Sequence, residues 1–154
     1  MIKAKLALTA FLIVVIAFYP TIHVVNNSIA QGLENQLLNC ELPPHSELID
    51  SASVAGKMLD NGNGMQWFGF ILIRSGMSED MLLEWYNNHL CVEKNDMIYV
   101  IKQETPYIFE DKDYQFKSYT DGNSLYQIQL YRNTPVGTEP SIWESILNFD
   151  LRGH

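Results

Sequence analysis

The side chains best suited to chemistry in this chain are two cysteines and two histidines. Cys40 and His45 lie close together in the sequence, as do His89 and Cys91. Two thiolates and two imidazoles form a ligand set that suits tetrahedral zinc. Neither pair has the spacing of a zinc finger, however, and residues two apart on a helix do not share a face. We therefore expect neither a metal site nor a cofactor.

The two cysteines also offer a disulfide. If the domain that carries them is exported, an oxidising compartment permits a bond between Cys40 and Cys91. This bond would close a loop of roughly 50 residues and contribute about 4 kcal/mol to stability in the chain-entropy model. The alternative is two unpaired thiols, one of them buried. We predict the disulfide.

Signatures of catalysis are missing from the sequence. It contains no G-x-S-x-G elbow, no H-E-x-x-H helix and no C-x-x-C pair. Asp80 and Glu84 are one helical turn apart, but most such carboxylate pairs are solvated. We therefore predict a protein that is not an enzyme. The alternative is a small-ligand sensor or hydrolase with a pocket near His89.

Aromatic residues are abundant and suggest a binding surface. We expect the three tryptophans, Trp67, Trp85 and Trp143, in the core. Several tyrosines lie on less regular segments, where some of them should be exposed. An aromatic surface on an exported domain is a reasonable site for a protein or cell-envelope partner. The candidate surface consists of Tyr107, Tyr114, Tyr119, Tyr126 and Tyr131.

The charge balance excludes one class of partner. The chain has 10 basic and 18 acidic residues and a net charge of −8. A nucleic-acid binder needs a basic surface for the phosphates, so we expect no nucleic-acid partner. Lys3 and Lys5 precede the first apolar run, and the rest of the chain is therefore more acidic than the whole.

The apolar run at the N-terminus predicts the location of the protein. Residues from Leu6 to Val25 carry no formal charge if His23 is neutral. About 20 helical residues span about 30 Å, the thickness of a hydrocarbon core. Since Lys3 and Lys5 lie before the run, the positive-inside rule keeps the N-terminus in the cytoplasm. We predict a single-pass membrane protein whose C-terminal domain lies outside the cell.

A cleaved signal peptide is the competing interpretation. Pro20 would break the helix, leaving an apolar stretch from Leu6 to Tyr19 that fits a signal sequence. Ser28 and Ala30 are small residues at suitable positions for cleavage after Ala30. The product would be a secreted protein that begins at Gln31.

The pattern divides the chain into three parts. Residues 1–25 form the cytoplasmic tip and the anchor, residues 26–42 a helical stalk, and residues 43–154 an extracytoplasmic domain. Ile29, Leu33 and Leu37 mark one helical face in the stalk. The two prolines that follow Leu42 end this helix.

The extracytoplasmic domain reads as an α+β fold. Turn signals and capping residues predict a small, mainly antiparallel sheet of about 4–5 strands, packed by one long and one short helix. The continuous apolar run at 65–74 predicts a central strand covered on both faces. The other strands are predicted at 51–59, 97–101 and 125–131, weaker ones at 107–109 and 114–119, and helices from Ser78 and Ser141.

Three short stretches carry a resemblance to a known group of proteins. These are residues 42–48 (LPPHSEL), residues 61–69 with NGNGM and a Phe-Gly pair, and Ile-Arg-Ser at 73–75 before the Ser78 helix. Over residues 1–90 the chain resembles small uncharacterised single-span proteins of Gram-positive bacteria. The resemblance implies a bacterial, membrane-anchored and exported protein, and it carries no activity. We therefore expect a non-enzymatic interaction module.

Overall fold

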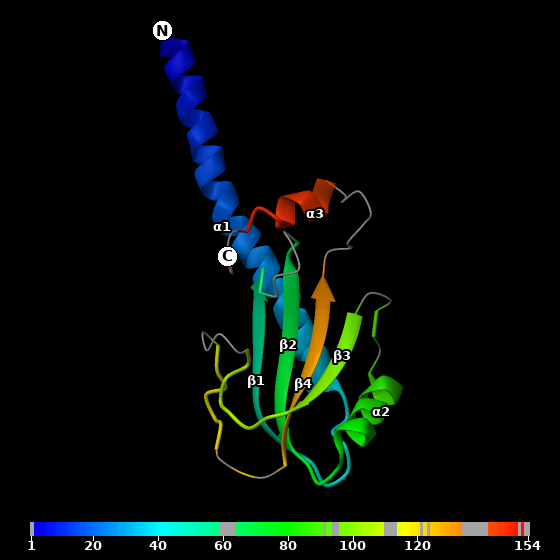
Figure 1. The fold of residues 1–154 in the computed structure, drawn as a ribbon. Helices are drawn as coiled ribbons and strands as arrows, with labels where there is room; N and C mark the ends of the chain where they lie inside the picture. Colours follow the sequence, from blue (N-terminus) through cyan, green and yellow to red (C-terminus); the bar gives the residue numbers. More distant parts are fainter. Residues whose placement is uncertain are drawn as a thin grey trace.

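The computed structural model describes residues 2–58, 64–90, 92–93, 96–109, 114–120, 122, 124–133, 142–150 and 152. Within the first helix, the side chains are described at Thr9 and from Phe18 onward. The helices are α1 (Ile2–Asn39), α2 (Glu79–His89) and α3 (Ile142–Leu147). The predicted α+β class is confirmed (Figure 1).

In the described residues, four antiparallel strands form one sheet. The strands are β1 (Glu47–Gly56), β2 (Gln66–Arg74), β3 (Asp96–Lys102) and β4 (Leu125–Asn133), in the order β1-β2-β4-β3. Each neighbouring pair is antiparallel, as the density of hairpin signals predicts. The sheet therefore has two edge strands, β1 and β3.

Strand β2 is the centre of the fold, and the prediction that both of its faces are covered is confirmed. All its residues except Arg74 are buried. Trp67 and Ile71 face the cluster that includes α1 and α2, whereas Phe68 and Phe70 face a second cluster on the opposite side of the sheet. A strand that is buried on both faces reads as a continuous apolar run, because alternation would expose one face to water.

Helix α1 is one continuous element that includes Pro20. Its C-terminal half crosses the sheet (Figure 1), and Ala30, Leu33 and Leu37 are each only 1% exposed. The helical face predicted in the stalk therefore packs on the strands. Residues 26–39 contribute to the core of the domain.

Gly69 in β2 lies where α1 comes closest to the sheet. A Cβ atom at this position would be 2.3 Å from the Glu34 backbone nitrogen and 2.4 Å from the Leu33 carbonyl carbon. Only glycine permits this approach, because any other side chain would meet helix backbone.

The opposite face of the sheet is covered by the segment between β3 and β4. Ile108 and Phe116 are buried there against Phe68, Phe70 and Leu72. The weak strands predicted at 107–109 and 114–119 are reduced to one bridge, between Tyr107 and Gln115. This segment covers the face with side chains instead of extending the sheet.

Helix α2 begins where its sequence predicts. The Ser78 side chain accepts a hydrogen bond from the Met81 backbone N–H, and Glu79 and Asp80 occupy the first turn. Serine at this position satisfies one of the free N–H groups of the helix. The turn predicted at residues 60–64 lies outside the described residues except for its last glycine, and the cap predicted at Ser141 lies outside them as well.

Tyr86 of α2 is a core residue, and the contribution of its buried hydroxyl to stability can be measured by substitution. Its side chain is fully buried, and its hydroxyl has no hydrogen-bond partner among the described residues. Burial raises the pKa of Tyr86 well above its ordinary value, and a charge on Cys40 would raise it further. The hydroxyl is therefore neutral at physiological pH.

We expect Tyr86→Phe to stabilise the protein by about 1 kcal/mol, because it removes an unsatisfied buried group and keeps the ring. Thermal unfolding measures the change. The control is Tyr99→Phe, whose ring is 43% exposed and whose loss of a hydroxyl should change stability by less than about 0.5 kcal/mol. A destabilised Tyr86→Phe protein would show that the hydroxyl has a partner.

Candidate functional site

The predicted disulfide involves one residue that the structure describes and one that it does not. Cys40 is partly buried and packs against the cluster that joins α1, α2 and the sheet. Cys91 lies outside the described residues. The bond between Cys40 and Cys91 therefore stays a prediction.

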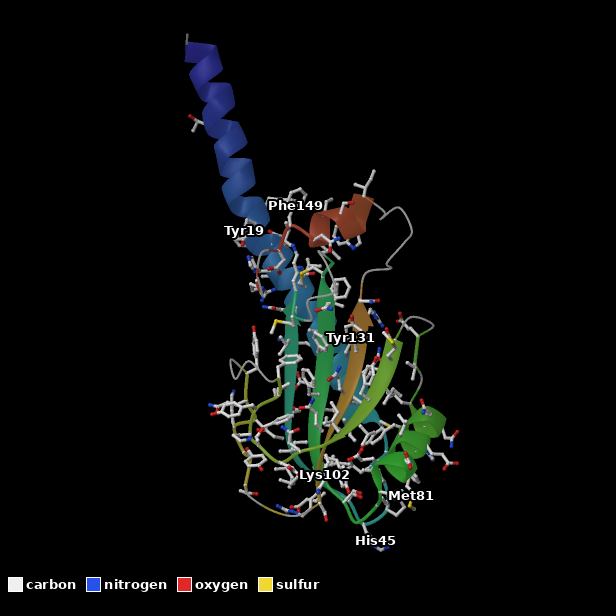
Figure 2. All side chains as sticks on the ribbon, viewed as in Figure 1. Tyr19, His45, Met81, Lys102, Tyr131 and Phe149 are labelled. Atoms are coloured by element: carbon white, nitrogen blue, oxygen red, sulfur yellow. The ribbon has the colours of Figure 1, made fainter. Side chains whose placement is uncertain are left out.

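In the described part of the chain, neither His45 nor His89 forms an ion pair with another side chain. The His89 ring stacks on Trp85 at 3.8 Å, and its Nδ1 atom is 2.8 Å from the Trp85 carbonyl oxygen. His45 lies in an exposed loop with a positive φ of 58°, at the end of the molecule away from α3 (Figure 2). In the part of the chain that is described, no three His, Cys, Asp or Glu residues are arranged to hold a metal ion. His89 therefore packs against Trp85 in the last turn of α2.

The five tyrosines predicted as one binding surface do not all lie on one face of the sheet. Tyr131 is only 4% exposed, and its hydroxyl accepts a hydrogen bond of 3.2 Å from Gln66. Tyr114 and Tyr119 pack beside it in the same cluster, whereas Tyr126 packs on the opposite face. Tyr107 is half-buried at the bridge to Gln115. Tyr131 is buried and the other four tyrosines are partly buried. The two tyrosines on β4 face opposite sides of the sheet because successive side chains of a strand alternate.

The most extensive polar cluster in the described residues surrounds Asp150. We call His23, Asn26, Asp150 and Arg152 the Asp150 cluster. The Asp150 carboxylate is inaccessible to solvent and accepts hydrogen bonds from Asn26 at 2.9 Å and from Arg152 at 2.6 and 2.9 Å. His23 Nδ1 is 3.3 Å from the same carboxylate. The cluster ties the C-terminal segment to α1.

Two further bonds extend this cluster into the sheet. The Asn26 Oδ1 atom accepts a hydrogen bond of 3.0 Å from the Trp67 indole, and the Asn26 amide donates one of 3.2 Å to the Leu147 carbonyl. Asn26 thereby connects α1, β2 and α3 through one buried side chain. Each polar group finds a partner, as a buried network requires.

The electrostatics of the cluster favour a charged carboxylate. Burial alone would raise the pKa of Asp150, but hydrogen bonds from Arg152 and Asn26 outweigh it and hold this pKa below its ordinary value. The hydrogen bond to Asp150 raises the pKa of Arg152. A carboxylate that is already paired with a guanidinium is a poor general base. The cluster therefore acts as a structural clamp.

The edge strand β3 presents an exposed apolar surface. Met97, Tyr99 and Ile101 are 39%, 43% and 44% exposed, and we call them the β3 stripe. The alternating residues Ile98 and Val100 pack towards α1 and α2. Because successive side chains in a strand point to opposite faces, the three exposed residues share one face.

The β3 stripe lies on the face of the sheet that, on β2, is covered by the segment between β3 and β4. Tyr99 pairs with Gln129, and Ile101 pairs with Gln127, which in turn pairs with Leu72 of β2. The segment between β3 and β4 covers the β2 side chains on this face. It leaves the β3 side chains on the same face exposed. Beneath the stripe, Gln127 is 1% exposed, and its Oε1 atom has no hydrogen-bond partner among the described residues.

The beginning of β3 is held by an ion-pair cluster. Arg132 of β4 binds both carboxylate oxygens of Asp96, at 2.6 and 2.8 Å, and contacts Glu93 at 3.0 Å. The bidentate pairing fixes the position of the edge strand relative to β4.

The second exposed apolar surface lies on and after α3. Ile142, Trp143 and Phe149 are 83%, 57% and 64% exposed, and we call them the C-terminal cap. The prediction that all three tryptophans are core residues is therefore wrong for Trp143. The indole of Trp67 is buried, and that of Trp85 donates a hydrogen bond of 3.1 Å to the Glu41 carbonyl.

The N-terminal apolar run lies mostly outside the described side chains. Among the residues with described side chains, none of the helices combines the length and the apolar character needed to cross a membrane. The side chains of residues 6–17, apart from Thr9, are not among them. The membrane anchor stays a prediction.

Comparison of the chain with protein-family models, with curated proteins and with solved structures finds no match. The resemblance to single-span bacterial proteins therefore stays an expectation.

Proposed function

We propose that this protein is a membrane-anchored extracytoplasmic interaction module that binds an extended segment of a partner protein along β3. The observation that carries the proposal is the β3 stripe on an edge strand. An edge strand has unpaired backbone N–H and C=O groups on its outer side, and these groups can pair with an added strand. The exposed side chains then contact alternate side chains of the partner.

The surroundings of the stripe support an added strand. The sheet order leaves the outer edge of β3 without a neighbouring strand among the described residues, while Arg132 and Asp96 hold the edge strand in place.

The anchor is supported by the N-terminal sequence. The run from Leu6 to Val25 has the length of a bilayer span, and Lys3 and Lys5 precede it. The acidic composition of the rest is compatible with a domain that does not adhere to anionic lipid head groups.

Cleavage after Ala30 is disfavoured by the packing of α1. Ala30 is 1% exposed in the middle of the packed half of the helix. A product that begins at Gln31 would lose His23 and Asn26, leaving the buried Asp150 with fewer partners. Arg152 would remain, but the loss of a hydrogen bond to a buried charged group costs about 1.5–3 kcal/mol.

The anchor is tested by mass spectrometry of the membrane and secreted fractions of a native-type host, without reduction. We expect an intact chain in the membrane fraction, lighter by two hydrogens if Cys40 and Cys91 are joined. A soluble product that begins at Gln31 would refute the anchor.

The β3 surface is tested by site-specific photo-crosslinking of the full chain in cells. A photoreactive phenylalanine analogue replaces Tyr99 in the stripe or, as a control, Met81 on α2, which is 53% exposed. We expect one discrete crosslinked protein from position 99 and none from position 81. Adding Ile101→Glu should abolish this product, because it puts a charge into the contact.

A second control, in addition to position 81, makes the crosslinking result specific. Glu84→Gln on α2 changes an exposed charge away from β3 and should leave the product from position 99 unchanged. Equal products from positions 81 and 99, or no product from position 99, would contradict the proposal.

A further inference from the structure

We infer that the C-terminal cap rests in the lipid interface of the bilayer that α1 enters, so that the domain has a second membrane contact. This inference rests on the proposed membrane anchor. The cap consists of Ile142, Trp143 and Phe149. Apart from Val24 on α1, these are the most exposed large apolar side chains in the described residues.

The length of α1 requires the bilayer to lie close to the domain. Among the described α1 side chains, Ile22 is the first that is buried, at 3% exposure. From Lys5 to Ile22 the helix rises about 26 Å, whereas a hydrocarbon core is about 30 Å thick. The charge-free run therefore enters the domain before it has crossed the bilayer. The adjoining end of the domain must lie at the membrane boundary.

The cap lies at this end of the domain. Helix α3 lies beside α1 where the helix leaves the sheet (Figure 1), and Phe149 and Tyr19 lie at the same level (Figure 2). The contacts agree, because Tyr19 packs edge-on against His23 at 4.5 Å, and His23 reaches Asp150, the neighbour of Phe149.

The side chains that point outward at this level are of the kind that favour an interface. Trp and Tyr are enriched where hydrocarbon meets water, because an apolar ring carries one polar group. Trp143 and Tyr19 are of this type, and Phe18, Phe149 and Ile142 add apolar area. Phe18 and Tyr19 are 45% and 41% exposed.

The cap is held rigidly relative to α1. Leu147 accepts a hydrogen bond from Asn26, and the Asn148 side chain accepts one of 2.7 Å from the Met65 backbone N–H. Asp150 is fixed by the Asp150 cluster. A rigid cap beside a membrane helix would fix the orientation of the domain relative to the bilayer.

The test uses the full chain in phosphatidylcholine vesicles with brominated acyl chains, which quench tryptophan emission on contact. We expect brominated vesicles to lower the emission of the wild-type protein relative to unbrominated vesicles. Trp143→Phe should remove most of this loss, because Trp67 is buried in the protein and Trp85 lies on α2. The substitution is at an exposed position, and unchanged thermal unfolding verifies the fold.

Flotation of the same vesicles separates the inference from the anchor. A chain that floats and loses equal emission with and without Trp143 retains its anchor but has no cap contact, which overturns the inference. A chain that does not float overturns the anchor and the inference together. Flotation with quenching that depends on Trp143 supports both.

Discussion

Gly69→Ala is expected to destabilise the protein by about 3 kcal/mol, the upper end of the usual range for an overpacked core. The added Cβ would lie 2.3 Å from the Glu34 backbone nitrogen, a distance that no rotamer change can relieve. Either α1 or β2 must move, and the movement would separate Leu33 from the central strand. Urea unfolding of the full chain measures the change as a lower midpoint.

The matched control for Gly69 is Gly32, which lies in α1 itself. A Cβ atom at Gly32 meets no heavy atom within 4 Å, and alanine favours a helix over glycine by about 0.5–1 kcal/mol. Gly32→Ala should therefore raise the unfolding midpoint. Equal midpoints for Gly69→Ala and the wild type would show that α1 does not approach β2 this closely.

Asp150→Ala is expected to cost about 3 kcal/mol, because removal of one partner from a buried ion pair leaves the others unsatisfied. Arg152 loses its main acceptor, and Asn26 loses one of the two acceptors of its amide group. The comparison is Glu47→Gln, which breaks a pair with Arg74 whose side chains are 65% and 43% exposed. An exposed pair should contribute less than about 1 kcal/mol.

The same cluster predicts how stability depends on pH. The pKa of Asp150 is lower in the folded protein than its ordinary value, so its contribution is present above the unfolded pKa of about 3.9 and is lost as the pH falls through the folded value. The acid side of the unfolding curve should be flatter in Asp150→Asn than in the wild type. An unchanged acid dependence would show that Asp150 is not the carboxylate that titrates with folding.

Local elements of this fold were predictable because their causes are local. The apolar run of β2 indicates burial on both faces, and Ser78 caps α2 whatever the rest of the chain does. The face marked by Ile29, Leu33 and Leu37 correctly predicts a helix. The same pattern suits a stalk or a core helix equally, because periodicity shows that a face is apolar but not what it contacts.

The polar clamp was not predictable from the order of the residues. Asn26 and Asp150 are 124 positions apart, and each is an ordinary polar residue in its own segment. Trp143 is exposed, whereas the sequence predicts it in the core because tryptophan carries a large apolar ring that usually packs inward. Its exposure depends on which side of α3 meets α1.

Composition and short-range spacing are sufficient to predict the α+β class, the central strand, the start of α2, the acidic character and the apolar N-terminal run. They do not predict that α1 packs on the sheet at Gly69, that Tyr126 and Tyr131 lie on opposite faces of the sheet, or that β3 and the C-terminal cap have exposed apolar side chains. The physical reason is that burial depends on contacts between segments distant in the chain. Such contacts leave no periodic signal in either segment.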